Sequence, residues 1–289
     1  MCERKIVKYK DMIVVKNNIE LRRLINQRIE EQGPNCDLND IDVSGITNMS
    51  HLFYRSKFNG DISQWDVSNV VDMTRMFANS KFDGDISKWD VSRVEDMDGM
   101  FCFSIFTGDI SNWDTSNVRD MRCMFSNSCF NGDISRWNVS NVKYMCYMFS
   151  DSWFIGDISN WDTSNVEDMS YMFYHSIFYG DISRWNVSSV VEMRGMFKDS
   201  IFDGDISKWD VSKVEDMKEM FKRSNFNGDI SQWNMSKVED MREMFMESRF
   251  TGDISGWNTS RVVNMRKIFS GMKERLTNKL TNWNTRRCR

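Results

Sequence analysis

A 24-residue repeat constrains this 289-residue chain more than any other feature. The stretch FDGDISKWDVSRVEDMDGMF begins at Phe82, and the stretch FDGDISKWDVSKVEDMKEMF begins at Phe202. Three of their 20 residues differ, and the copies lie 120 residues apart, which is five units of 24. Self-similarity at a fixed period of this length is typical of stacked repeat proteins, not of a single globular core.

Each position of the repeat is a column that keeps one residue type at 24-residue intervals. Tryptophan recurs without a gap from Trp65 to Trp257, and phenylalanine recurs in the same way from Phe58 to Phe250. The unit is F-x-G-D-I-S-x-W-(D/N)-(V/T)-S-x-V-x-x-M-x-x-M-F-x-x-S-x. A degenerate copy starts at Asp37, with Ile41 in the tryptophan column, and a truncated copy, LTNWNT, starts at Leu280. About ten copies with atypical ends are what a stacked array needs to cover its core.

Within a unit, the apolar spacing changes from that of a strand to that of a helix. Ile62, Trp65 and Val67 lie in a β-favouring stretch. From residue 70 to residue 77, apolar side chains recur every three or four positions, as they do on one face of a helix. Ser92 followed by Glu95 matches a capping box at the start of such a helix. Phe82-x-Gly84-Asp85 has the composition of a turn, in which glycine supplies backbone freedom.

We therefore predict an α/β repeat solenoid of about ten coils, each with one short parallel strand and one short helical segment. Residues 37–276 form this array, and the tryptophan, phenylalanine and methionine columns stack in its interior. Residues 1–36 are predicted to be an N-terminal cap, made of a strand and an amphipathic helix, and residues 277–289 a partial repeat with a basic tail. Asn18 is the predicted N-cap of that helix and Gly33-Pro34 its end. Its apolar face consists of Ile19, Leu21, Leu24, Ile25 and Ile29.

The motif resembles that of the BspA-type leucine-rich repeat surface proteins, and in particular a subgroup found in mycoplasma lipoproteins. The resemblance rests on I-x-x-W-x-V, V-x-x-M-x-x-M-F and S-x-F-x-G-D-I-S and extends over residues 37–285. It implies a leucine-rich-repeat-like solenoid with a parallel sheet on one face and an adhesin-like or interaction role. It implies no catalytic residues.

The compartment is left open between the cytoplasm and the cell surface. The resemblance implies a surface or secreted protein. The seven cysteines do not follow the repeat, which favours a reducing compartment. The N-terminal MCERKIVKYK lacks the apolar segment of a secretory signal, and no apolar run reaches the length of a membrane span.

No catalytic, cofactor or metal site is predicted, and we expect the protein not to be an enzyme. The Met73 and Met76 columns share a stripe with Val70 and Phe77, which favours core packing over a copper-binding row of thioethers. The Asp61 column is predicted to form turns, because G-D-I-S supplies fewer ligands than calcium-binding repeats do.

Candidate binding residues are found where the columns change in composition. The column before the repeat phenylalanine is polar at both ends and apolar in the middle. Outward-facing aromatic and apolar side chains in these central coils would mark a binding or oligomer surface. The alternative is that Trp153 and the isoleucines pack under the turn as local core. The predicted partner-binding residues are Tyr144, Tyr147, Trp153, Ile155, Tyr171, Tyr174, Ile177 and Tyr179.

We expect a non-catalytic interaction module that binds a protein, peptide or host ligand through these coils. The alternative is a self-assembling structural protein that forms homo-oligomers through the same patch or through end-to-end contacts. Residues 261–289 hold nine basic residues and one acidic residue, a charge of +8, so the overall −4 leaves −12 on the remainder. A polar face at the Gln64 column is a second candidate surface, for a peptide or glycan. Nucleic acid is disfavoured, because lysine and arginine are scattered through every coil.

Overall fold

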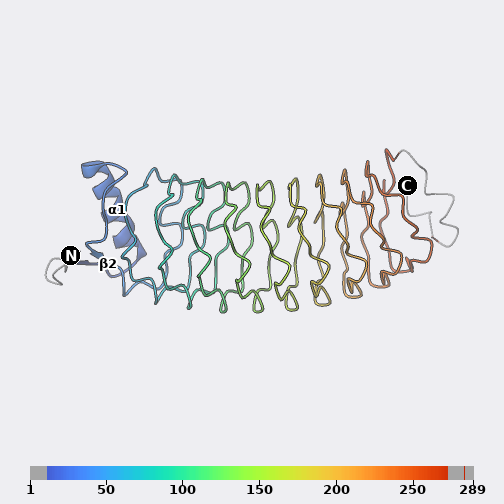
Figure 1. Ribbon diagram of the computed structural model, residues 1–289, viewed down its shortest axis with the longest axis horizontal. Helices are drawn as coiled ribbons and strands as arrows, with labels where there is room; N and C mark the ends of the chain where they lie inside the picture. The colour runs from blue at the N-terminus through green and yellow to red at the C-terminus, as the bar shows by residue number, and fades with distance from the viewer. Residues whose placement is uncertain (1–11, 273–282, 284–289) are drawn as a thin grey trace.

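The computed structural model describes residues 12–272 and Trp283. Figure 1 shows an elongated stack of similar coils, and helix α1 lies across one end of the stack. The colour changes steadily from blue to red along the long axis, so each 24-residue coil lies beside its neighbours in the sequence (Figure 1). The chain is therefore a repeat protein, as its periodicity predicts.

Three regular elements form the N-terminal end. Strand β1 (Ile13–Val14) pairs in parallel with strand β2 (Ile41–Asp42), and helix α1 (Asn18–Gln32) connects them along the chain. Leu21 and Ile25 of α1 are buried and belong to the same core cluster as the first coils. The helix therefore covers the apolar side chains that the first coil would otherwise expose to water.

The predicted helix is present, but two of its details differ from the prediction. Asn17, not Asn18, is the N-cap, because its side chain accepts a hydrogen bond from the Glu20 amide at 2.9 Å. Ile19 is 83% exposed and does not belong to the buried face. It precedes Leu21 by two residues, and a helix turns 100° per residue, so the two side chains point to opposite sides. Gly33 ends the helix as predicted, and its amide donates to the Ile29 carbonyl.

Each coil contributes equivalent side chains to one continuous core. The repeat tryptophans are 3–4% exposed, and the rings of Trp161 and Trp185 lie 6.4 Å apart with an interplanar angle of 5°. The indole nitrogen of Trp161 donates at 3.0 Å to the carbonyl of Ile134, 27 residues earlier, and the other tryptophans of the column repeat this bond. Trp283 continues the stack against Trp257 at 6.0 Å. The predicted stacking of tryptophans in a shared interior is confirmed.

Backbone hydrogen bonds join neighbouring coils along the methionine segment, which extends from residue 72 to residue 79 in the second coil. Every second amide of this segment donates to a carbonyl of the next coil, and the amides between them close turns within their own coil. Parallel bridges such as Asp72 to Asp96 recur in steps of 24 residues. In the coil that begins at residue 130, the donors are Met145, Tyr147, Phe149 and Asp151, and the acceptors are Asp168, Ser170, Met172 and Tyr174, at 2.8–3.0 Å.

The prediction of a short helical segment in each coil is wrong, because residues 33–272 form no helix. The spacing of three to four residues comes from consecutive turns, in which Met148 donates to Met145 and Tyr147 has a positive φ of 59°. The capping box is not formed either, because the Glu95 amide donates to Val71 of the preceding coil. In an α-helix the Met148 amide would donate four residues back instead of three.

The strand expected at Ile62, Trp65 and Val67 is also absent. The Trp65 amide donates to the Ile62 carbonyl and the Val70 amide to the Val67 carbonyl, so this side of the coil consists of turns. Among the coils that the structure describes, the first alone has a strand there, because β1 pairs with β2 at that level. The parallel ladder lies instead in the segment where a helix was expected.

The turn predicted at the G-D-I-S motif is confirmed, although its glycine has another role. The Ser63 amide donates to the Asp61 carboxylate at 2.8 Å, and this bond lowers the pKa of Asp61. Gly84 does not have a positive φ. A Cβ at Gly84 would lie 2.8 Å from the Phe82 ring, so the column needs glycine because the phenylalanine ring packs directly against its backbone.

Candidate interaction surface

An exposed apolar column extends along five consecutive coils. We call it the Ile–Trp column, and its members are Ile105, Cys129, Trp153, Ile177 and Ile201. Each member is exposed, and Trp153, at 69%, is more exposed than the three isoleucines. Lys81 and Asn225 occupy the same position in the coils on either side. The apolar character therefore begins and ends within the array.

The local chain direction explains why these side chains face outward. Ser128 and Phe130 are buried, and Cys129 between them is exposed, as in an extended segment whose side chains alternate between two faces. The Cys129 amide donates to the carbonyl of Ser104 in the preceding coil at 3.3 Å. Successive members of the Ile–Trp column therefore lie in neighbouring coils. The alternative in which Trp153 and the isoleucines pack under the turn is wrong.

Two more of the predicted residues extend this surface sideways. Ile155 and Tyr179 occupy the position after the buried phenylalanine, and both are exposed, Tyr179 at 66%. The Ile155 amide donates to the side chain of Asn131 in the preceding coil at 2.9 Å. Polar residues occupy this column at Asn131 and Asp203, so the apolar pair is confined to two central coils.

Tyr147, Tyr171 and Tyr174 form a second group, which we call the tyrosine cluster. The rings of Tyr147 and Tyr171 stack with centroids 4.8 Å apart, and Tyr174 meets Tyr171 edge-on at 6.1 Å. The ammonium group of Lys198 lies over the Tyr174 ring at 5.5 Å. Burial raises the pKa of Tyr147 to about 12, so its hydroxyl group is neutral at pH 7 and can donate a hydrogen bond.

Tyr144 occupies a different position in its coil from the members of the tyrosine cluster. Its ring lies under the guanidinium group of Arg122 at 5.6 Å, and it forms a parallel bridge with Asp120. The eight predicted residues therefore comprise the tyrosine cluster, an exposed group around Trp153, and Tyr144. Their role in binding a partner stays a prediction.

Sequence reasoning left Ile105, Cys129 and Ile201 out of the predicted site, although they complete the Ile–Trp column. The composition of the column was sufficient to find them, since all three are apolar where its ends are polar. Phe103 was also missed and is 58% exposed. The equivalent positions Asn79 and Asn127 are polar, which is the signal that could have identified it.

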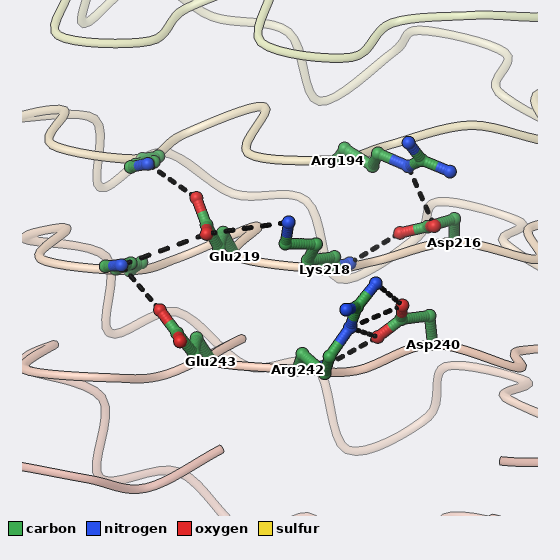
Figure 2. A network of polar contacts seen from close by, with 9 residues as sticks. Arg194, Asp216, Lys218, Glu219, Asp240, Arg242 and Glu243 are labelled. Carbon is green, nitrogen blue, oxygen red and sulfur yellow. Dashed lines mark hydrogen bonds and ion pairs between the residues drawn. The ribbon is translucent and has the colours of Figure 1, made fainter. Parts of the chain in front are cut away.

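Beyond the tyrosine cluster, the methionine segments carry paired charges. Figure 2 shows Glu219 between lysine side chains and Asp216 beside Arg194, whose Nε lies 2.8 Å from the carboxylate. Glu219 is in the same column as Tyr147 and Tyr171. In the next coil, the hydrogen bond from Lys222 lowers the pKa of Glu243. The change from tyrosine to paired charge marks one boundary of the aromatic surface.

The described residues contain neither a group of metal ligands nor a membrane-spanning helix. Within residues 12–272 and Trp283, no three histidine, cysteine, aspartate or glutamate side chains converge as metal ligands would. The helix in that part of the chain does not have the length and apolar character needed to cross a bilayer.

His175 contacts the Asp151 carboxylate through Nδ1 and lies beside Tyr174.

Comparison with known proteins identifies a family but no individual relative. Neither the curated proteins nor the solved structures include a match to this chain. One family model, described as a Mycoplasma protein of unknown function, DUF285, matches residues 22–127, 102–202, 149–249 and 200–289. These overlapping matches together cover residues 22–289, and the chain therefore belongs to the DUF285 family of Mycoplasma proteins of unknown function.

Proposed function

We propose that this protein is a non-catalytic interaction module that binds a protein partner through its central coils. The single observation that carries this proposal is the Ile–Trp column, in which five consecutive coils expose an apolar side chain. Four spacings of about 4.8 Å between coils give the column a length of about 19 Å, a scale suited to an extended segment of a partner.

The composition of the surface supports a protein partner. Tryptophan is rarely exposed to this extent, and aromatic residues are enriched in the cores of protein interfaces. Trp153 has exposed apolar neighbours in both adjacent coils, and Tyr179 and Ile155 widen the surface. The surrounding polar residues, such as Lys81 and Asn131, resemble the hydrated rim of an interface.

We further propose that the stack is a variant of the leucine-rich-repeat solenoid related to BspA-type surface proteins, with an adhesin-like role. Two features support this relation: neighbouring coils pair in parallel through the methionine segments, and a single core continues from coil to coil. Under this proposal, the protein acts where a partner on a host or neighbouring cell can reach the exposed column.

A second copy of the chain is the alternative occupant of this surface. In a symmetric dimer the same patch is used twice, and two regular columns with equal spacing can lie against each other in antiparallel orientation. The length and spacing of the Ile–Trp column favour this arrangement over an end-to-end contact. Most of the basic C-terminal segment that motivates end-to-end contact lies outside the described residues.

Site-specific photocrosslinking tests both proposals. The photoreactive residue p-benzoylphenylalanine replaces Trp153 in one variant and Lys81 in a control variant, because Lys81 is an exposed member of the same column at its polar end. Each variant is irradiated alone and with detergent-solubilised host-cell surface proteins, and adducts are identified by mass spectrometry. We expect a specific adduct with another protein at residue 153 but not at residue 81.

The other outcomes are also decisive. An adduct of twice the mass of the chain, formed without other proteins and matched by dimer sedimentation, would support the self-association alternative. Equal labelling at residues 153 and 81 would contradict the proposed surface.

A further inference from the structure

A cavity of about 350 Å³ opens along the first four coils, outside the Ile–Trp column and the tyrosine cluster. Its lining includes Tyr54, Arg55, Arg75, Cys102, Phe103 and Cys123. None of these residues belongs to the Ile–Trp column or to the tyrosine cluster. The volume lies within the range of small-molecule sites, which is about 300–1,000 Å³.

Gly99, whose neighbours include the lining residues Arg75 and Cys102, lacks the side chain that most other coils have at this position. Arg75, Gly99 and Cys123 occupy equivalent positions in successive coils, and all three have positive φ. A Cβ at Gly99 would lie 3.0 Å from Cγ of Arg75, so the arginine stem lies over the glycine. At the equivalent Gly195, the Tyr171 ring would lie 2.3 Å from such a Cβ and occupies the space itself.

The walls of the cavity combine aromatic rings, thiols and two cations. Phe103 is exposed and has a φ of 55°, an unfavourable conformation for a large side chain. Arg55 lies over the Tyr54 ring at 5.2 Å. Burial raises the pKa of the Cys123 thiol to about 12, so this wall is neutral and polarisable at pH 7.

The charge of the cavity is positive, although the chain as a whole has a net charge of −4. Among the described residues that line it, two are arginines and none is acidic. Asp98 approaches Arg75 from outside the lining, with Oδ2 3.7 Å from Nε, and the arginine side chain remains half exposed. The terminal nitrogens of Arg75 can therefore donate hydrogen bonds to a second, closer anionic partner.

We propose that this cavity binds a small organic anion with a planar aromatic body and a carboxylate group. The carboxylate would accept the paired hydrogen bonds that a guanidinium group donates, from Arg75 with Arg55 nearby. The aromatic body would pack against Phe103 and the thiols of Cys102 and Cys123. This inference goes beyond the proposed protein-binding role and does not depend on it.

Calorimetric titration of the full chain with 2-naphthoate tests the proposal. The variant Arg75→Met keeps the apolar stem over Gly99 but removes the charge, and we expect its dissociation constant to rise by about tenfold or more, because hydrogen bonds to charged groups are strong. The control Lys267→Met removes a cation at the equivalent position of a distant coil, where φ is also positive, and should leave binding unchanged. The neutral analogue 2-naphthamide should bind more weakly than 2-naphthoate.

Thiol protection locates the bound probe independently. Iodoacetamide reacts with the thiolate, and burial raises the pKa of both Cys102 and Cys123, so alkylation is followed at pH 9. Saturating 2-naphthoate should slow the alkylation of these two cysteines, measured by mass spectrometry, while exposed Cys129 serves as an internal reference. No binding of 2-naphthoate, equal binding by wild type and Arg75→Met, equal loss in Lys267→Met, or equal protection of Cys129 would each overturn the proposal. Unfolding midpoints of the variants confirm that they are folded.

Discussion

Tryptophan occurs in two contrasting environments within the repeat array. Trp161 is buried, stacks on Trp185 and donates its indole hydrogen to Ile134, whereas Trp153 is largely exposed. The sequence predicted both roles, because one residue recurs in every coil and the other replaces polar residues in its column. Stacking requires equivalent side chains only in the interior. A residue that recurs at every 24th position is therefore buried, and a residue that differs from its equivalents in other coils can be exposed.

These environments predict different responses to the same substitution. Trp161→Phe should reduce the free energy of unfolding by about 1–3 kcal/mol, because the buried Ile134 carbonyl loses its donor. Trp153→Phe, the matched control, should change it by less than about 0.5 kcal/mol, as exposed substitutions usually do. Urea unfolding followed by circular dichroism measures both, and a similar destabilisation by the two variants would contradict the assignment of the core.

At the scale of elements, the helix was predicted well and the repeat segments were not. Helix α1 has local signals at both ends, and the Leu21–Ile25 spacing can only be satisfied by one buried face. The position of its N-cap was wrong by one residue, because two adjacent asparagines have the same capping chemistry. Asn18 instead donates to Asn48 and to the Ser50 carbonyl, contacts with the first coil that are invisible in the local sequence.

The corrected N-cap leads to a prediction about α1. Asn17→Ala should destabilise the helix by about 1 kcal/mol, because the Glu20 amide loses its acceptor. Hydrogen exchange of the α1 amides should then become about fivefold faster, since RT is about 0.6 kcal/mol. Asn26→Ala, an exposed change in the middle of the same helix, should not accelerate exchange. If Asn17→Ala left exchange unchanged, Asn17 would not be the functional N-cap.

The absence of a helix in the repeats has a specific physical cause. Apolar residues spaced three or four positions apart are compatible with an α-helix. They are also compatible with consecutive turns that have a residue of positive φ at every fourth position. In the Tyr147 segment, positive φ occurs at residues 147 and 151, and every second amide donates to the next coil. Only a neighbouring coil can accept those hydrogen bonds, so no single unit could reveal the choice.

At the scale of the whole molecule, the 24-residue period is the unit of stability. Deleting residues 202–225 removes one complete coil and keeps every column in register, so the shortened chain should fold. Its urea m-value should fall by about one tenth, in proportion to the surface exposed on unfolding.

A half-coil deletion provides the control. Deleting residues 202–213 displaces the columns by twelve positions and should leave tryptophans opposite polar residues, giving an unfolded or insoluble chain. Both deletions are compared by circular dichroism and urea unfolding. Equal tolerance of the two deletions would show that stacking in register does not stabilise the array.

The amino-acid sequence by itself determined the period, the buried columns, the terminal helix and the eight-residue candidate surface. It could do so because burial follows side-chain chemistry, which each copy repeats. Only the tertiary structure decided which backbone groups pair between coils, how the eight residues divide into separate groups, and which side chains line the cavity. These features depend on the coil above and the coil below. A backbone amide meets its acceptor, and a side chain meets its neighbours from other coils, only when the coils are stacked.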